Sequence, residues 1–193
     1  MAQARILVAE DTEIVAQALE GQLSSLGYEV VGVAWSGNEA IRLCEQLRPD
    51  LVLLNMQIAN PSGDIVAQQI DERTSTPIIM LSASCDAGSI RKVEQAGVLA
   101  YLVKPIKPEE LPPAIDVALA RHHELQQLRD HVDDLHETLE SRKLIERAKG
   151  ILMRRLHIDE REAESRIRQR AKDKQAKVKD IAQAIVDSDA LLS

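Results

Sequence analysis

The residues that interrupt regular secondary structure are confined to the first part of this chain of 193 residues. All seven prolines lie at or before Pro113, and seven of the eight glycines lie at or before Gly97. In the 80 residues after Pro113, only Gly150 interrupts a sequence rich in Ala, Leu, Arg, Lys, Glu and Gln. Because these residue types favour helices, we expect the second part of the chain to be almost wholly helical.

Short aliphatic runs alternate with helix-like segments in the first part of the chain. The five runs are RILVA, YEVVGVA, DLVLL, PIIML and AYLV. Between them lie segments such as EIVAQALEGQLSSLG, whose apolar residues recur at helical spacing. Five strands that alternate with five helices predict an α/β fold with a parallel sheet covered by helices on both faces.

The composition excludes several classes of protein. A hydrophobic fraction of 45% and a charged fraction of 28% are typical of a globular protein. No apolar stretch approaches the roughly 18 residues that a membrane span needs, and the N-terminus turns acidic before the apolar core of a signal peptide could form. The two cysteines are too few for a disulfide framework. We therefore expect a cytoplasmic protein that does not bind a membrane.

Polar residues stand at the ends of four of the predicted strands. Glu10 and Asp11 follow the first strand, Asn55 the third, Ser82 the fourth and Lys104 the fifth. Ligands of open parallel sheets bind beyond the carboxyl ends of the strands, so these side chains form the candidate site of the first domain. The alternative is that the acids and the lysine form only an ionic network at the edge of the sheet.

The motifs AEDTE, DLVLLN, MLSAS and YLVKP resemble the receiver domain of bacterial two-component response regulators, over about residues 3–122. The resemblance implies a flavodoxin-like (βα)5 fold. It also implies paired acids that bind Mg²⁺, a carboxylate that accepts a phosphoryl group from a histidine kinase, a hydroxyl and a lysine that contact this group, and a switch aromatic. The matching positions, in this order, are Glu10 and Asp11, Asn55, Ser82, Lys104 and Tyr101.

Asn55 departs from the family pattern. An acyl phosphate needs a carboxylate nucleophile, and the carboxamide of Asn55 is neutral, so we expect no phosphorylation by the usual route. A Mg²⁺ site is possible but weakened, because only the carboxylates of Glu10 and Asp11 remain. Two accounts stay open: a receiver that is naturally not phosphorylated and is regulated by a sensor protein or ligand, or a replacement that holds an inactive state.

A heptad pattern predicts a coiled coil in the linker helix after the receiver domain. Five apolar residues are spaced 3, 4, 3 and 4 apart: Leu125, Leu128, Val132, Leu135 and Leu139. This pattern favours a homodimer, and the alternative is one amphipathic helix that folds back on its own chain. The predicted division is a receiver domain at residues 1–122, a coiled-coil linker helix at 123–140 and a small all-α domain at 141–193.

The last domain is predicted to contain three helices, at about 141–156, 160–173 and 177–188. Residues 142–179 hold 14 basic and 6 acidic side chains, a net charge of +8. Such a charge predicts a polyanion such as nucleic acid as the partner. The alternative is a solvated helical surface whose charges pair at i,i+4, as in Glu162 with Arg166.

The run SRKLIERAKGILMRRL, then DEREA and then KVKDIAQAIV, resemble the ANTAR domain, over about 55 residues. The resemblance implies an RNA-binding output module of transcription antiterminators, which is not an enzyme and acts as a dimer on RNA hairpins. Glu164 stands where the family usually has an aromatic residue, and His157 stands where glycine is common. His157 is the milder change, because histidine tolerates a positive φ better than most residues.

The candidate RNA contacts are the basic residues of the last domain. They are Arg142, Lys143, Arg147, Lys149, Arg154, Arg155, Arg168, Arg170 and Lys174. No aromatic residue lies beyond Tyr101, so bases cannot stack on aromatic rings in this domain. Two alternative functions remain: a coiled-coil adaptor for another protein, and a DNA-binding regulator controlled by a receiver that lacks its phosphate chemistry.

Overall fold

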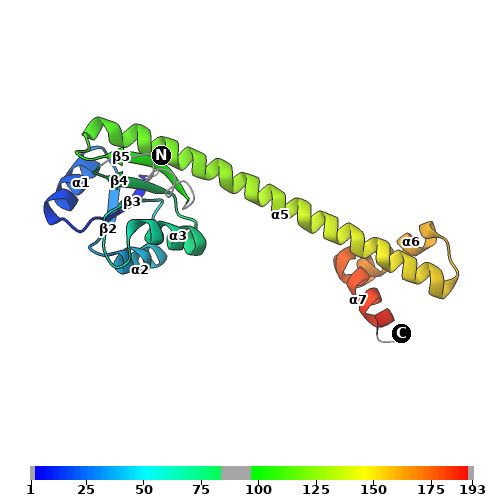
Figure 1. Ribbon diagram of the computed structural model, residues 1–193. Coiled ribbons are helices and arrows are strands. Elements are labelled where there is room, and N and C mark those ends of the chain that lie inside the picture. Colours follow the sequence, from blue (N-terminus) through cyan, green and yellow to red (C-terminus); the bar gives the residue numbers. More distant parts are fainter. Residues whose placement is uncertain (1–2, 84–96, 191–193) are drawn as a thin grey trace. The chain divides into compact units, whose positions relative to one another are not determined.

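The computed structural model describes residues 3–83 and 97–190 and contains two compact units. The first unit is Met1–Gln126 and the second is Gln127–Ser193. The first combines a sheet with helices, and the second is helical (Figure 1). No helix in the described ranges is long and apolar enough to span a membrane.

A parallel sheet of five strands forms the centre of the first unit, in the order β2-β1-β3-β4-β5. The strands are β1 (Arg5–Ala9), β2 (Glu29–Ala34), β3 (Leu51–Asn55), β4 (Ile78–Ser82) and β5 (Val98–Val103). Each of the five runs that predicted strands overlaps one of them, three runs beginning one residue earlier, so the flavodoxin-like fold class is confirmed.

The described helices of the first unit cover both faces of the sheet (Figure 1). They are α1 (Glu13–Ser25), α2 (Gly37–Leu47), α3 (Gly63–Thr74) and the beginning of α5 (Leu111–Leu156), which follows a short 3-10 turn, η1 (Pro108–Glu110). The predicted fourth helix falls at residues 84–96, outside the described ranges.

Two core clusters lie on opposite faces of the sheet, because successive residues of a strand point to opposite sides. Leu7 and Val52 pack with α2 and α3 in one cluster, and Ile6 and Leu53 pack with α1 and α5 in the other. All four side chains are fully buried. The strands therefore carry apolar residues at consecutive positions between their ends, as a sheet covered on both faces requires.

Helix α5 begins earlier than the prolines suggested. The region predicted to be helical lies after Pro113, and the helix starts at Leu111, so that Pro112 and Pro113 lie in its first turn. Proline is tolerated there because the first N–H groups of a helix have no partner within the helix. From Leu111 the helix continues without interruption to Leu156, which confirms the long helix that the sequence predicted.

The second unit consists of the end of α5 with α6 (Glu160–Asp173) and α7 (Val178–Ala190). The turn before α6 contains His157 at φ 54°, the conformation expected where glycine is common. Asp159 caps α6 by accepting a hydrogen bond from the N–H of Glu162 at 2.8 Å. The apolar faces of the three helices form one core.

Small side chains lie at the centre of this core. Ala148 and Ala182 are fully buried, and they pack with Ile151, Ile167 and Val186. Alanine at these positions lets the helix backbones approach closely while the isoleucines fill the space between them.

Gly150 has no steric reason to be glycine. It lies inside α5, and an added Cβ would meet no atom within 4 Å. We expect Gly150→Ala to raise the free energy of unfolding of the second unit by about 0.5–1 kcal/mol, because alanine loses less backbone entropy in a helix. Urea denaturation followed by circular dichroism measures the change.

Gly27→Ala is the matched control, since Gly27 has φ +87° and alanine is strained there. We expect that variant to destabilise the first unit. Destabilisation by Gly150→Ala would contradict the packing described for α5.

Candidate functional site

Four of the predicted site residues meet at the carboxyl edge of the sheet. Glu10 follows β1, Asn55 ends β3, Ser82 ends β4 and Lys104 follows β5. The four strands are adjacent and parallel, so their carboxyl ends lie side by side. Glu10, Asn55 and Ser82 are buried there.

The carboxamide of Asn55 bridges the two acids. Its Nδ2 donates to Glu10 Oε1 at 3.1 Å and to Asp11 Oδ1 at 3.0 Å. Its Oδ1 accepts from the backbone N–H of Gln57 at 3.2 Å. Both ends of the amide are therefore engaged, and its donor side faces the carboxylates.

Glu10 is a fully buried carboxylate with three hydrogen-bond donors around it. Besides Asn55, Lys104 Nζ donates to its Oε2 at 2.5 Å, and the backbone N–H of Thr12 donates to its Oε1 at 3.2 Å. A buried charge is costly unless it is paired and hydrogen-bonded, and this one is both. The ammonium group of Lys104 balances the charge of this carboxylate.

A divalent cation fits this arrangement poorly. Mg²⁺ requires oxygen ligands in an octahedral arrangement, but the nitrogen of Asn55 lies between the oxygens of Glu10 and Asp11. Within residues 3–83 and 97–190, no group of three His, Cys, Asp or Glu side chains could hold a metal ion. The amide donates hydrogen bonds to the carboxylate oxygens that a cation would otherwise bind.

Tyr101 lies in β5 with its ring turned inward. Its hydroxyl donates to Met56 Sδ at 3.2 Å, and its ring packs against the core cluster that α2 and α3 cover. Met56 follows Asn55 directly in the chain. No sequence pattern indicated this contact, because the two residues are 45 positions apart.

Gly63 also shapes the edge of the site. An added Cβ at this position would lie 2.8 Å from the carbonyl oxygen of Asn55 and 2.8 Å from two backbone atoms of Met56. Glycine therefore lets α3 begin close beneath the loop that follows Asn55.

Eight of the nine predicted RNA contacts lie on the surface of the second unit. The exposed residues are Arg142, Lys143, Arg147, Arg154, Arg155, Arg168, Arg170 and Lys174. Lys143 pairs with Glu140, Arg168 with Glu164, and both Arg154 and Arg155 with Asp189. No ion pair to a described acid is found for Arg142, Arg147, Arg170 or Lys174.

Lys149 does not fit the prediction that it contacts RNA. Its side chain is buried, with 5% of the residue exposed, and its Nζ lies 2.7 Å from Glu146 and 2.7 Å from Glu160. Hydrogen bonds to these two carboxylates raise the pKa of Lys149 above its usual range. Lys149 joins α5 to the first residue of α6, so we assign it a structural role and remove it from the RNA-binding set.

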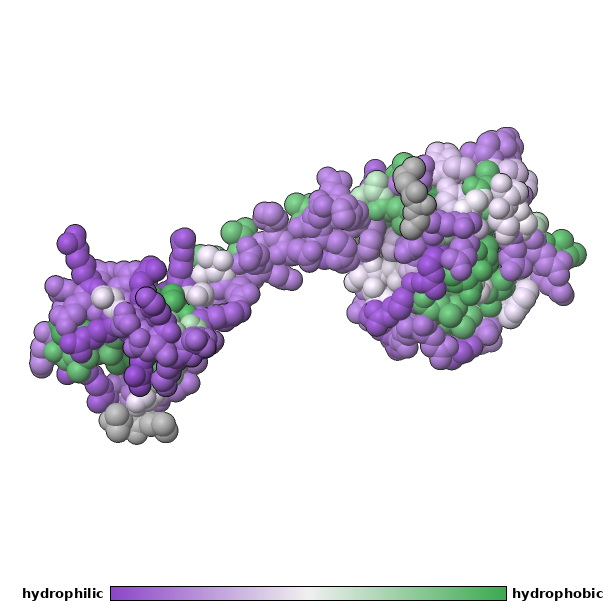
Figure 2. Space-filling model, turned by 180° about the vertical axis from the view of Figure 1, so that it is seen from behind, coloured by the Kyte–Doolittle hydropathy of each residue, from purple (hydrophilic) through white to green (hydrophobic). Residues whose placement is uncertain are grey.

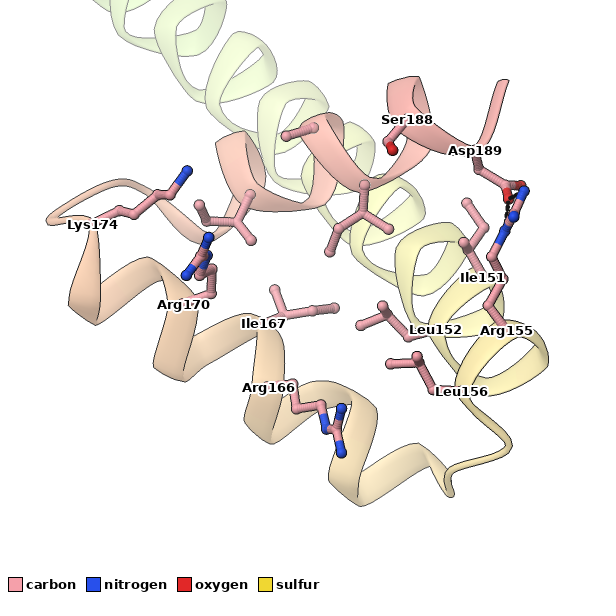
Figure 3. Close-up of a pocket in the computed structure, with 13 residues that line it drawn as sticks. Ile151, Leu152, Arg155, Leu156, Arg166, Ile167, Arg170, Lys174, Ser188 and Asp189 are labelled. Carbon is pink, nitrogen blue, oxygen red and sulfur yellow. Dashed lines mark hydrogen bonds and ion pairs between the residues drawn. The ribbon is translucent and has the colours of Figure 1, made fainter. Parts of the chain in front are cut away.

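A cavity of about 510 Å³ opens between α5, α6 and α7 (Figure 3). Its walls are mainly aliphatic, and its rim carries basic residues of α5 and α6. The aliphatic side chains are Ile151, Leu152, Leu156, Ile167, Ile181, Ala184 and Ile185. The polar ones are Arg155, Arg166, Arg170, Lys174, Ser188 and Asp189.

The sequence did not predict this cavity. In the sequence, its aliphatic residues fit the apolar face of a helix that packs on a core. That some of them instead border an opening follows only from how the three helices pack.

Two family models match the chain. The response regulator receiver domain matches residues 6–116, and the ANTAR domain matches residues 133–186. The chain is 36% identical over 184 residues to the transcriptional regulatory protein PdtaR of Mycobacterium tuberculosis. This match covers 95% of the chain and 90% of that relative.

Solved receiver structures are similar to part of the chain. The signal receiver domain of a modulated diguanylate cyclase from Desulfovibrio desulfuricans has a TM-score of 0.60 and 30% identity, and covers 63% of this chain and 98% of that one. A putative response regulator from Chloroflexus aurantiacus has a TM-score of 0.58 and 30% identity, and covers 62% and 99%.

Replacement of Asn55 by aspartate should create a cation-dependent site. In Asn55→Asp three carboxylates would repel one another, and Mg²⁺ would relieve the repulsion. At a free Mg²⁺ concentration about ten times the Kd of the variant for this ion, we expect Mg²⁺ to raise the free energy of unfolding of the variant by about 1.4 kcal/mol. We also expect acetyl phosphate to label it with a hydroxylamine-sensitive phosphoryl group. Thermal unfolding with and without Mg²⁺, and mass spectrometry, measure the two effects.

The unaltered chain and Asn38→Asp are the controls. Asn38 is exposed on α2, so aspartate there adds the same charge outside the site. Neither control should respond to Mg²⁺ or take up phosphate. Labelling of the unaltered chain at Asn55 would refute the prediction.

Proposed function

The chain belongs to the response regulators that join a receiver domain to an ANTAR domain, and on this premise we propose that it is a transcription antiterminator that binds hairpins in nascent RNA. The proposal rests above all on the charge of the second unit, where residues 142–179 carry a net charge of +8. A bound transcript hairpin would then prevent a competing terminator hairpin from forming.

Helix α6 supports an interaction with phosphates. Arg166 and Arg170 of α6 and Lys174, the C-cap residue that follows this helix, recur every four residues along the edge that borders the cavity. Of these, only Arg166 is held by an acid, Glu162 at 2.7 Å. Arg170 and Lys174 have no ion pair within the described part of the chain, so phosphate contacts would cost them no internal partner.

We propose that the receiver is regulated without phosphorylation of Asn55. Its carboxamide cannot form an acyl phosphate, and its two polar atoms are already engaged by Glu10, Asp11 and Gln57. A sensor protein, a histidine kinase acting as a binding partner, or a ligand would then supply the input. If Asn55 is instead a replacement that holds an inactive state, the same contacts explain how that state is held. Mg²⁺ binding is weak in either case.

We propose that the chain forms a parallel homodimer through the middle of α5. The five seam residues predicted from the heptad pattern are between 43% and 58% exposed. In Figure 2, apolar groups interrupt the hydrophilic surface along this part of α5. Lys179 of α7 pairs with Glu137, which lies at the heptad position opposite the seam, so α7 leaves the seam open.

Charge at the edges of the seam favours a parallel arrangement. With Leu125 at position a and Leu128 at position d, Glu124 occupies position g and Arg129 the following position e. In a parallel coiled coil, position g of one helix faces the next position e of the other. Glu124 would therefore meet Arg129 of a second copy. The dimer would present two basic units to two hairpins.

The adaptor alternative uses the same exposed seam for a different protein. In that case the apolar stripe of α5 would be the working surface, and the basic face would have no ligand. RNA binding by the purified chain distinguishes the two functions.

RNA affinity should depend strongly on salt. The probe is a pool of RNA hairpins with a fixed stem and a random loop. If about four phosphates are neutralised and each contributes about −0.7 to the slope of log affinity against log salt concentration, this slope is about −3. We expect Arg170→Gln with Lys174→Gln to reduce the magnitude of this slope to about 1.4. Filter binding across a salt series measures it.

Arg42→Gln with Arg73→Gln removes two exposed arginines of the first unit and serves as the control, with an unchanged slope. Arg154 and Arg155 are poorer choices, because both pair with Asp189 of α7 and their loss would also affect the fold. Affinity independent of salt, or equal affinity for duplex DNA of the same length, would refute RNA binding as the function.

The dimer should depend on the seam. We expect Leu135→Asp to convert the dimer to a monomer, because it would place two carboxylates in an apolar layer. Ile65→Asp is the control, since Ile65 is 44% exposed on α3 and Leu135 is 57% exposed. Size-exclusion chromatography with light scattering measures the mass. A monomeric unaltered chain, or a dimeric Leu135→Asp, would rule out this interface.

A further inference from the structure

We propose that the cavity between α5, α6 and α7 receives an unstacked base from the loop of a bound RNA, while the basic edge of α6 holds the phosphates beside it. This inference rests on the proposed RNA-binding function and assigns the place where a base is contacted. On one surface, basic residues would bind the RNA backbone through their charge, and an apolar cavity would hold a base.

The walls of the cavity suit the face of a base. Leu152 and Leu156 of α5 and Ile167 of α6 point into the opening from two sides (Figure 3). Leu156 is 46% exposed, so apolar surface remains uncovered there. The volume of about 510 Å³ falls in the range of about 300–1,000 Å³ that is common for small-ligand sites, which is ample for one base.

The rim determines the charge of the occupant. Arg166, Arg170 and Lys174 are four residues apart in the chain. Because an α-helix rises 1.5 Å per residue, basic residues follow one another about every 6 Å along the axis of α6 and its C-cap. The repeat is close to the spacing of successive phosphates in an extended strand. An apolar interior beside a row of cations is complementary to a base with its flanking phosphates.

The composition of the second unit favours such a site for base recognition. RNA-binding surfaces commonly stack loop bases on aromatic rings, and this chain has no aromatic residue after Tyr101. Aliphatic side chains can also sandwich a base that has left its stack. The cavity supplies aliphatic walls where aromatic rings are missing.

Polar groups at one end of the cavity can form hydrogen bonds with the edge of the base. Ser188 and Asp189 of α7 line this end, where Asp189 accepts a hydrogen bond from Arg155 Nε at 2.6 Å. This pair also holds the guanidinium of Arg155 at the rim of the cavity (Figure 3). A planar guanidinium in this position can stack on a base.

The decisive variant is Leu156→Ser, with Met153→Ser as its matched control. Both residues lie in the last turn of α5, Met153 is 37% exposed, and only Leu156 lines the cavity. The probe is the tightest hairpin recovered from the pool with a fixed stem and a random loop. A second set of hairpins carries an abasic site at each loop position in turn.

We expect Leu156→Ser to weaken binding about 5- to 150-fold, the range for the loss of one stacked base. The salt slope should not change, because no phosphate contact is lost. One abasic position should weaken binding by the unaltered chain to a similar degree and have no further effect on Leu156→Ser, the coupling expected when both changes remove one contact. Met153→Ser should bind like the unaltered chain.

Other outcomes overturn the proposal in distinguishable ways. If the unaltered chain binds no hairpin, the proposed function itself fails. If hairpins bind but Leu156→Ser equals Met153→Ser, or no abasic position is coupled to it, RNA binding stands and the cavity does not hold a base. If Leu156→Ser instead lowers the mass measured by light scattering, the cavity is a contact between copies of the chain.

Discussion

One unbroken helix supplies core side chains to both compact units. Leu111 and Ile115 of α5 belong to a core cluster of the first unit, and Ala148 and Ile151 belong to the core of the second. Helical stability comes mostly from tertiary packing, so the two packed ends hold the helix in place. The stretch between them stays helical although its apolar residues, from Leu125 to Leu139, are exposed. A folded helix with an open apolar stripe follows from this constraint, and a second copy can cover it without any refolding.

The two candidate sites differ in whether their charged side chains are paired within the chain. At the edge of the sheet, Lys104 and the amide of Asn55 satisfy the buried acid Glu10 from within the chain, so no outside ion is needed. On α6, Arg170 and Lys174 have no ion pair with any acid that the structure describes. Binding of an anion would therefore be more favourable at the second unit, because it does not require an existing ion pair to break.

The sequence predicts what depends on local pattern and misses what depends on packing. The strands could be predicted because a sheet buried on both faces requires uninterrupted apolar runs. The positive φ at His157 followed from the family resemblance, because glycine is common at that position. Lys149 was misjudged because its partner Glu160 is 11 residues away, across the turn between α5 and α6. The cavity was not predicted because its walls come from three helices whose packing angles the sequence pattern does not encode.

Strand β5 links the edge of the sheet to the helix that leads to the seam. Tyr101 contacts Met56, next to Asn55, on the face that α2 and α3 cover, while its neighbours Ala100 and Leu102 pack in the cluster that includes α5. Because neighbouring residues of a strand face opposite sides, a displacement of Tyr101 also shifts the side chains that α5 packs on. If the receiver is regulated without phosphorylation of Asn55, as we propose, phosphate chemistry does not drive that displacement. Input to this chain would then act on β5 or α5 directly, through whatever binds the outer surface of either element.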